Sequence, residues 1–137
     1  MLSEIKLIEV STSSIHFKHN PLKGGTNKGN FEADIGEITV EAGKKLKSNE
    51  SLSVIEINAS PKVVGISTSS DGSVHETFNL GFGLRLVFTY PDSIDLTPQY
   101  LEESRWFFEY NVKIFFKIQC EQILKSTTIK NLELPYC

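Results

Sequence analysis

Residues 105–120 read RWFFEYNVKIFFKIQC, and we expect the rest of the chain to be organised around this stretch. It lies inside a longer segment, 97–130, which contains neither glycine nor proline after Pro98. Thr97 followed by Pro98 is typical of a helix start, because a threonine side chain can cap free backbone amides and proline suits the first helical position. The sequence therefore predicts one long helix over residues 97–130.

The charged residues of this predicted helix recur every four positions. They are Arg105, Glu109, Lys113, Lys117, Glu121 and Lys125. A helix turns about 100° per residue, so each step of four rotates the charged line by about 40° and the whole line by about 200°. Apolar side chains occupy most of the remaining circumference, and such a helix must be covered on more than one side. We expect it to pack on its own sheet and on a second body, such as another subunit.

Four segments upstream of the helix alternate between apolar and polar residues and are predicted to be strands. The connections before Tyr90 are short enough for hairpins, so we predict an α+β fold with a four-stranded antiparallel meander sheet and one long C-terminal helix packed on it. Gly36 marks a slip in the second strand, and Pro61 requires an edge, a bulge or a break in the third. The predicted strands are 5–17, 31–40, 52–66 and 78–88.

The fourth predicted strand has the strictest alternation in the chain. One of its faces is strongly apolar, whereas the other is nearly bare at Gly81 and Gly83, where a neighbouring backbone or a ligand could approach closely. The chain of 137 residues is predicted to form a single domain. Its parts would be a sheet over 3–90, a helix over 97–130 and an extended tail over 131–137.

Composition and charge exclude several classes of protein. The net charge of −3 is mild and does not favour nucleic-acid binding, which calls for a basic patch. The first ten residues include Glu4, Lys6 and Glu9, so no secretory signal is predicted. Lys113 and Lys117 interrupt the apolar runs, so no membrane insertion is expected. Two cysteines do not form a disulfide framework, and we place the protein in the cytoplasm.

Sites for nucleotides and metals are not supported by the sequence. The glycine-rich loop 24–29 lacks the Gly-Lys-Ser/Thr order and the following helix of a phosphate-binding loop, so a flexible hairpin loop is the better interpretation. His16 and His19 are three positions apart on a strand, which places them on opposite faces, and Cys or acidic partners are not clustered near them. We predict neither a cofactor nor a metal site.

Catalytic signatures are equally weak. The Gly-x-Ser-x-Gly pattern is absent, and Cys120 lies among aromatic residues, where it is expected to act as a small buried hydrophobe. The acidic pair Glu102 and Glu103 suits a helix start, because it lies near the positive end of the helix dipole. We therefore predict that the protein is not an enzyme, although a site assembled from scattered residues would escape any spacing rule.

Several features together resemble the SecB-type protein-export chaperones. They are the four predicted strands, the long helix containing Asn111-Val112, the closing residues NLELP at 131–135, and IHF at 15–17 ahead of Asn20-Pro21. The similarity spans nearly the whole chain. It implies subunits that pair into dimers and then a tetramer, with the long helices between two sheets.

The resemblance also implies a function without cofactor or nucleotide. Such proteins bind non-native polypeptides in the cytoplasm, either for handover to the export ATPase or, in toxin-associated relatives, to protect an unstable antitoxin. Export-type members continue beyond the Leu-Pro tail into a second helix and an acidic tail, whereas this sequence stops at Cys137. We therefore expect a C-terminally shortened relative with an altered client groove.

Two sets of residues are predicted to form the functional surfaces. Apolar surface favours extended apolar segments without reading their sequence. The expected polypeptide-binding residues are Pro21, Leu22, Phe31, Ile35, Trp106 and Phe107. The expected subunit-interface residues are Phe108, Asn111, Phe115, Phe116 and Ile118. The alternative function is a small-molecule carrier with an apolar cavity between the curved sheet and the helix, for which Gly81 and Gly83 would provide room.

Overall fold

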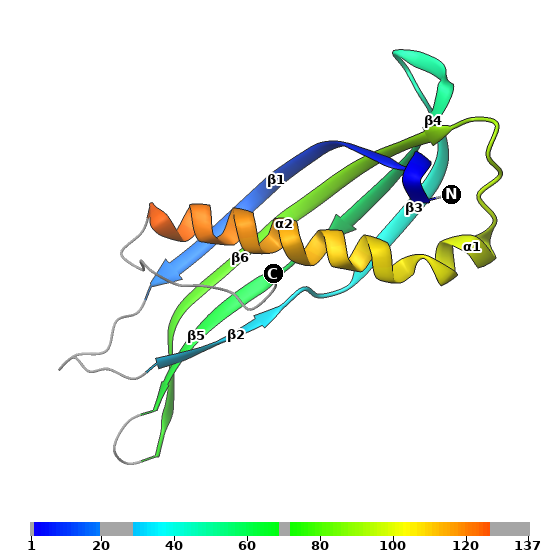
Figure 1. Cartoon of the computed structure of the whole chain (residues 1–137). Helices are drawn as coiled ribbons and strands as arrows, with labels where there is room; N and C mark the ends of the chain where they lie inside the picture. The colour runs from blue at the N-terminus through cyan, green and yellow to red at the C-terminus, as the bar shows by residue number, and fades with distance from the viewer. Residues whose placement is uncertain (1, 20–28, 69–71, 127–137) are drawn as a thin grey trace.

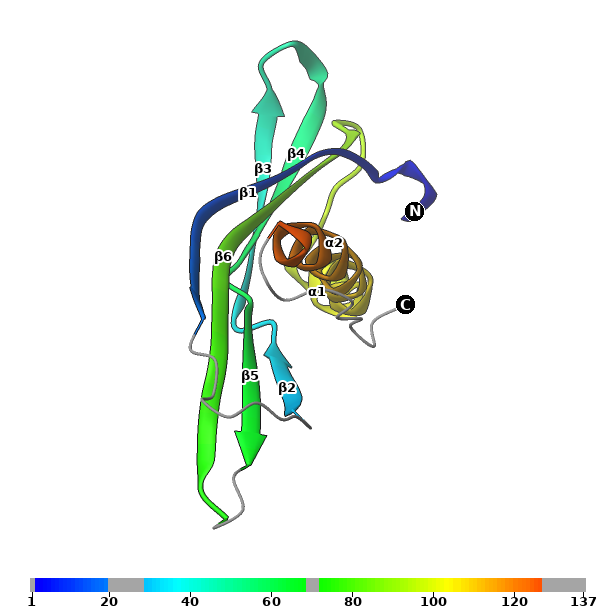
Figure 2. The ribbon, with the colours of Figure 1, turned by 90° about the vertical axis from the view of Figure 1, so that its left-hand side faces the viewer.

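The computed structural model describes residues 2–19, 29–68 and 72–126 and contains one antiparallel sheet with helices on one side (Figures 1 and 2). A short 3-10 helix, Leu2–Glu4, precedes the sheet. The strands are β1 Lys6–His19, β2 Gly29–Asp34, β3 Ile38–Leu46, β4 Asn49–Ala59, β5 Lys62–Thr68 and β6 Val74–Pro91. The helices are α1 Pro98–Glu103 and α2 Arg105–Lys125.

Strand β6 is the centre of the sheet. Along one edge it pairs with β1, from Lys6 opposite Thr89 to His19 opposite Phe78. Along its other edge it pairs first with β5 and then with β4, and these two strands pair in turn with β2 and β3. The predicted meander is therefore wrong, because the first strand lies beside the last one, as in a Greek key. Alternation specifies which side chains share a face but not which strands are neighbours.

The predicted count of four strands is also wrong, because two of the predicted strands are each divided in two. The second breaks at Gly36, which has φ of 75° and whose backbone N–H donates to Asp34 Oδ1 at 2.8 Å. The third breaks at Ser60 and Pro61. A Cβ on Gly36 would lie 3.1 Å from the carbonyl oxygen of Ser60, so the two breaks adjoin each other. The division lets β4 and β5 diverge from one another while both remain paired with β6.

The predicted single helix is interrupted at Ser104, which separates α1 from α2. The expected start is confirmed, since Thr97 Oγ1 accepts a hydrogen bond from the Tyr100 amide at 3.1 Å and Pro98 begins the helix. The α2 helix ends at Lys125, with Ser126 as its C-cap. The predicted continuation to residue 130 and the tail over 131–137 lie outside the described residues, apart from Ser126.

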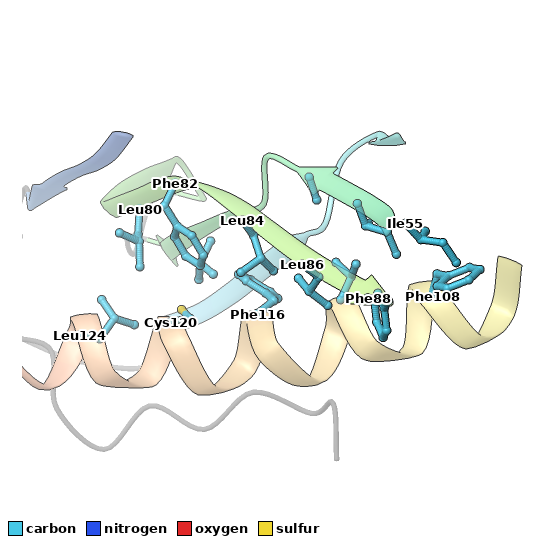
Figure 3. Close-up of a cluster of buried hydrophobic side chains, with 14 of the residues drawn as sticks. Ile55, Leu80, Phe82, Leu84, Leu86, Phe88, Phe108, Phe116, Cys120 and Leu124 are labelled. Atoms are coloured by element: carbon cyan, nitrogen blue, oxygen red, sulfur yellow. The ribbon is translucent and has the colours of Figure 1, made fainter. Parts of the chain in front are cut away.

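The hydrophobic core lies between the sheet and α2 (Figure 3). The alternation predicted for the fourth strand is confirmed in β6, where every second residue from Phe78 to Phe88 is apolar and faces the core. From the helix, the core receives one residue per four positions. These fully or nearly fully buried helical residues are Phe108, Val112, Phe116, Cys120 and Leu124.

Candidate functional site

The face of α2 directed away from the sheet carries a second line of apolar residues. Trp106, Tyr110, Ile114 and Ile118 also recur every four positions, and each lies two residues, or about 200°, from a member of the buried line. Trp106 is 61% exposed, Tyr110 55% and Ile118 41%, and Ile114 is half-buried. We call these four residues the outer apolar line. Figure 2 shows α2 covered by the sheet on one side only.

The outer apolar line is connected to the core through Phe107. Its ring is edge-on to Trp106 at a centroid distance of 6.1 Å and tilted against Phe88 of β6 at 6.0 Å. Phe107 is half-buried, so it fixes one side of the exposed indole while still facing solvent in part. Such edge-to-face contacts hold aromatic rings in defined orientations. The rings of Trp106, Phe107 and Phe88 therefore form a continuous contact from the exposed start of α2 to the core. We call Trp106 and Phe107 the aromatic step.

Polar contacts hold the beginning of α2 in place. Arg105 Nε donates to Glu109 Oε1 at 3.0 Å, and Arg105 Nη2 donates to the carbonyl oxygen of Ile38 in β3 at 3.3 Å. Asn111 Nδ2 donates to the carbonyl oxygen of Phe107 at 2.9 Å. The Arg105 contact joins the helix to β3 at the end where Trp106 is exposed, so the orientation of that aromatic step depends on tertiary structure.

The predicted polypeptide-binding residues occupy three different positions. Trp106 and Phe107 lie at the exposed start of α2, whereas Phe31 in β2 and Ile35 just after it are half-buried against the core. Phe31 lies opposite Gly65, its cross-strand partner in β5. The remaining two predicted residues, Pro21 and Leu22, lie outside the described residues.

The predicted subunit-interface residues divide into two groups. Phe108 and Phe116 are fully buried in the chain's own core, where Phe116 contacts Phe82 at a ring-centroid distance of 5.9 Å. Phe108 and Phe116 therefore pack inside the chain and cannot contact another subunit. The prediction of a subunit contact remains for Asn111, Phe115 and Ile118. Asn111 and Phe115 are half-buried, and Ile118 is exposed. Position in the four-residue repeat separates the groups, because Phe108 and Phe116 belong to the buried line.

Sequence reasoning did not include Tyr110 and Ile114 among the site residues. Their spacing of four from Trp106 and Ile118 was readable in the sequence. Which of the four-residue lines faces the sheet was not readable, because three of the lines carry apolar residues. Figure 3 shows Phe108 and Phe116 on the sheet side of the helix, which settles the choice.

Gly81 and Gly83 face away from the helix, because their neighbours Phe82 and Leu84 face the core. They cannot provide room for a ligand between sheet and helix, as the carrier alternative required. Instead they line an open hollow of about 560 Å³ on the opposite face of the sheet. Both polar and apolar residues line this hollow, and Arg85 at its edge is held by carboxylates of Glu9 and Glu56 at 2.7 and 3.0 Å.

Chemical groups suited to metal binding do not gather in the described part of the chain, where no three His, Cys, Asp or Glu side chains form a potential metal site. Burial, and secondarily Glu121, raises the pKa of the Cys120 thiol to about 12, so this cysteine is not a reactive nucleophile. Within the described residues, no helix is long and apolar enough to cross a membrane.

A solved structure of the Mycobacterium tuberculosis Rv1957 SecB-like chaperone, in complex with a ChAD peptide from the Rv1956 HigA1 antitoxin, is similar to this chain with a TM-score of 0.65. The match covers 99% of this chain and 92% of that chain at 10% sequence identity. The chain has a SecB-like fold. No protein-family model and no curated protein sequence matches it.

The SecB-like fold confirms the resemblance inferred from sequence, at the level of architecture. At 10% identity the likeness concerns the backbone arrangement and does not transfer site residues. The Rv1957 protein is a chaperone whose structure holds an antitoxin peptide.

Proposed function

We propose that this protein is an ATP-independent cytoplasmic chaperone that binds non-native polypeptides through apolar surface. The observation that carries the proposal is the outer apolar line on α2, together with the aromatic step formed by Trp106 and Phe107. A row of large apolar side chains, three of which are exposed and one half-buried, is typical of an interaction surface. The antitoxin peptide bound to the structurally similar Rv1957 chaperone supports a polypeptide as the ligand class.

The physical basis of binding is burial of apolar area. Each Å² of apolar surface removed from water contributes about 25 cal/mol, irrespective of the sequence that supplies it. An exposed tryptophan offers a large and rigid contact area. Trp106 and Phe107 are the proposed primary contacts, and Phe31 and Ile35 are proposed to extend the surface along the sheet.

The proposal includes assembly and partners. We propose a homo-oligomer, a dimer or a tetramer, with Asn111, Phe115 and Ile118 at the subunit contact. Clients are export precursors or an unstable antitoxin, and the corresponding partner is an export ATPase or a toxin–antitoxin pair. The protein is proposed to act without a cofactor and to catalyse no reaction.

The carrier alternative is disfavoured by the packing between α2 and the sheet. Phe88, Phe108 and Phe116 are fully or nearly fully buried there, and the Phe88 and Phe108 rings are edge-on at a centroid distance of 5.6 Å. These side chains fill the space in which a carrier would hold its ligand. A bound apolar molecule in protein purified under native conditions would restore this alternative.

The chaperone proposal is tested by suppression of aggregation of a chemically unfolded model protein, followed by light scattering with and without ATP. We expect suppression in both conditions and a clear loss of it in Phe107→Asp and Trp106→Asp. Val74→Asp is the matched control, since Val74 is 65% exposed on β6 and lies outside the proposed surface. Full activity of Phe107→Asp at unchanged native mass would remove Phe107 from the binding surface. Full activity of both variants would contradict the proposed site.

A further inference from the structure

We propose that the hollow on the helix-free face of the sheet binds a small molecule that carries an anionic group, either a phosphate or a carboxylate. The hollow lies over Gly81 and Gly83 of β6 and has a volume of about 560 Å³, which is in the range of small-molecule sites. Figure 2 shows the helices on the other side of the sheet. The proposed site is therefore separate from the polypeptide-binding surface proposed on α2.

Gly81 forms part of the floor of the hollow, and packing within the chain does not require a glycine there. A Cβ at this position would meet its nearest atoms, Lys62 Cγ and the Pro61 carbonyl oxygen, at 3.9 Å, an ordinary contact distance. Gly81 does not have a positive φ either. A glycine inside a strand weakens the strand, and it often marks a place where a ligand approaches the backbone closely. We infer that Gly81 keeps the space above β6 open.

Gly83, two residues further along β6, completes the floor for a different reason. Its cross-strand partner in β1 is Ser13. A Cβ at Gly83 would lie 2.7 Å from Ser13 Oγ, so the glycine allows the Ser13 hydroxyl to lie over β6. The two glycines thus leave a bare backbone floor with a hydroxyl group at its side.

Two irregular segments of backbone border this floor and contribute further hydroxyl groups. One is the register shift in β1, where Ser14 has φ of 51°, a left-handed conformation that is uncommon for residues other than glycine. The other is the break between β4 and β5 at Ser60 and Pro61. Ser14 and Ser60 line the hollow from the two sides of β6, and serine hydroxyls can donate hydrogen bonds to an anion.

Lys62 selects an anionic group as the ligand. It is the cross-strand partner of Gly81, it lines the hollow, and it forms no ion pair with another residue of the described part of the chain. Arg85, the other cation that lines the hollow, is already bound by the carboxylates of Glu9 and Glu56. Arg85 lies four residues from Gly81, or about 13 Å along the strand. This exceeds the Debye length of about 8 Å at physiological salt, so these carboxylates oppose an anion beside Lys62 only weakly.

Backbone amide NMR of the full-length chain, labelled with ¹⁵N, tests the site with two probes. The protein is titrated with sodium phosphate and, separately, with sodium succinate, each at constant ionic strength. The amides of Ser14, Lys62 and Gly81 are expected to shift along a saturating curve with at least one probe, whereas those of α2 should not move. Saturation with phosphate or with succinate identifies the anionic group that the site accepts.

Two variants connect the shifts to the structure of the hollow. Lys62→Gln removes the positive charge and is expected to weaken binding about tenfold or more. Gly81→Val fills the floor and should abolish the saturating shifts, and Gly81→Ala is the smaller change if the valine variant fails to fold. The matched control is Lys44→Gln, since Lys44 is an exposed lysine of β3 outside the hollow, and this variant should bind like the wild type. Urea denaturation verifies that each variant is folded.

The outcomes separate this inference from the proposed function. Shifts that do not saturate with either probe, or equal affinity in Lys62→Gln and the wild type, would indicate a general salt effect and overturn the inference. Unchanged affinity in a folded glycine variant would overturn it as well. Aggregation suppression is measured on the same preparations as a separate test of the chaperone proposal. Normal suppression without saturable anion binding would leave the chaperone proposal standing and remove the anion site.

Discussion

The ring of Phe78 on β6 lies against the Cα of its cross-strand partner Gly65 on β5. A Cβ at Gly65 would collide with the Cδ1 and Cε1 atoms of this ring and would lie 2.7 Å from Thr77 Oγ1. The aromatic ring therefore occupies the volume that any larger residue at position 65 would need. This pair lies immediately before the register shift between Gly65 and Ile66 in the ladder of β5 and β6.

Gly65→Ala is expected to lower the free energy of unfolding by about 1–3 kcal/mol, because the new methyl group overpacks the Phe78 contact. The matched control is Gly81→Ala on β6. A Cβ there would meet its nearest atoms, Lys62 Cγ and the Pro61 carbonyl oxygen, at 3.9 Å, so this change should be neutral or slightly stabilising. Urea denaturation of both variants measures the difference, and equal effects of the two would contradict the packing argument.

Phe116→Ala is expected to destabilise the protein by about 3–5 kcal/mol, because the ring is fully buried and contacts Phe82. Ile118→Ala, only two residues further along α2, should cost less than about 1 kcal/mol, since Ile118 is 41% exposed. Thermal unfolding at low protein concentration, where association contributes little, compares the two. A larger loss for Ile118→Ala would mean that the wrong face of α2 has been assigned to the core.

Glu56 is expected to make stability depend on pH. Hydrogen bonds from Arg85, and secondarily from Asn58, lower the pKa of the Glu56 carboxyl below its ordinary value of 4.5. Because the folded-state pKa is the lower one, the contribution is complete above 4.5 and disappears as the pH falls through the folded-state pKa. Glu56→Gln should cost about 1 kcal/mol or less at pH 7, since both partners are partly exposed to solvent.

The measurement is urea denaturation of the wild type and Glu56→Gln between pH 3 and pH 7. The two unfolding free energies should converge as the pH falls, because protonation removes the charge that the substitution has already removed. Glu37→Gln, at an exposed position between β2 and β3, is the control and should leave the pH dependence nearly unchanged. A constant difference between wild type and Glu56→Gln over this range would exclude the ion pair as its cause.

Cys120 is expected to resist thiol reagents in the folded protein, because burial raises its pKa to about 12 and the residue has no solvent exposure. In a Cys137→Ser chain, Ellman's reagent at pH 8 should detect almost no thiol until denaturant is added, and then one equivalent. Rapid labelling under native conditions would show that α2 separates from the sheet on the timescale of the assay.

Several local features were predictable from sequence because their causes are local. Thr97-Pro98 begins a helix through a side-chain cap and a fixed φ, and neither depends on distant residues. The strict alternation from Phe78 to Phe88 assigned the core face of β6 correctly. A break was among the predicted outcomes at Pro61, and the third predicted strand does divide there, whereas at Gly36 only a slip was predicted and the second predicted strand divides into two.

The α+β class, the apolar face of β6, the start of the helix and the repeat of four along α2 could be predicted from the sequence, since these follow from periodicity and backbone preference. The pairing of β1 with β6, the division of the helix at Ser104, and the burial of Phe108 and Phe116 beside the exposure of Trp106 and Ile118 depend on how the elements pack. The physical reason is that three of the lines along α2 carry apolar residues, so hydrophobicity alone favours no single orientation. Packing against the sheet selects the line that is buried, and this choice leaves the outer apolar line available for binding.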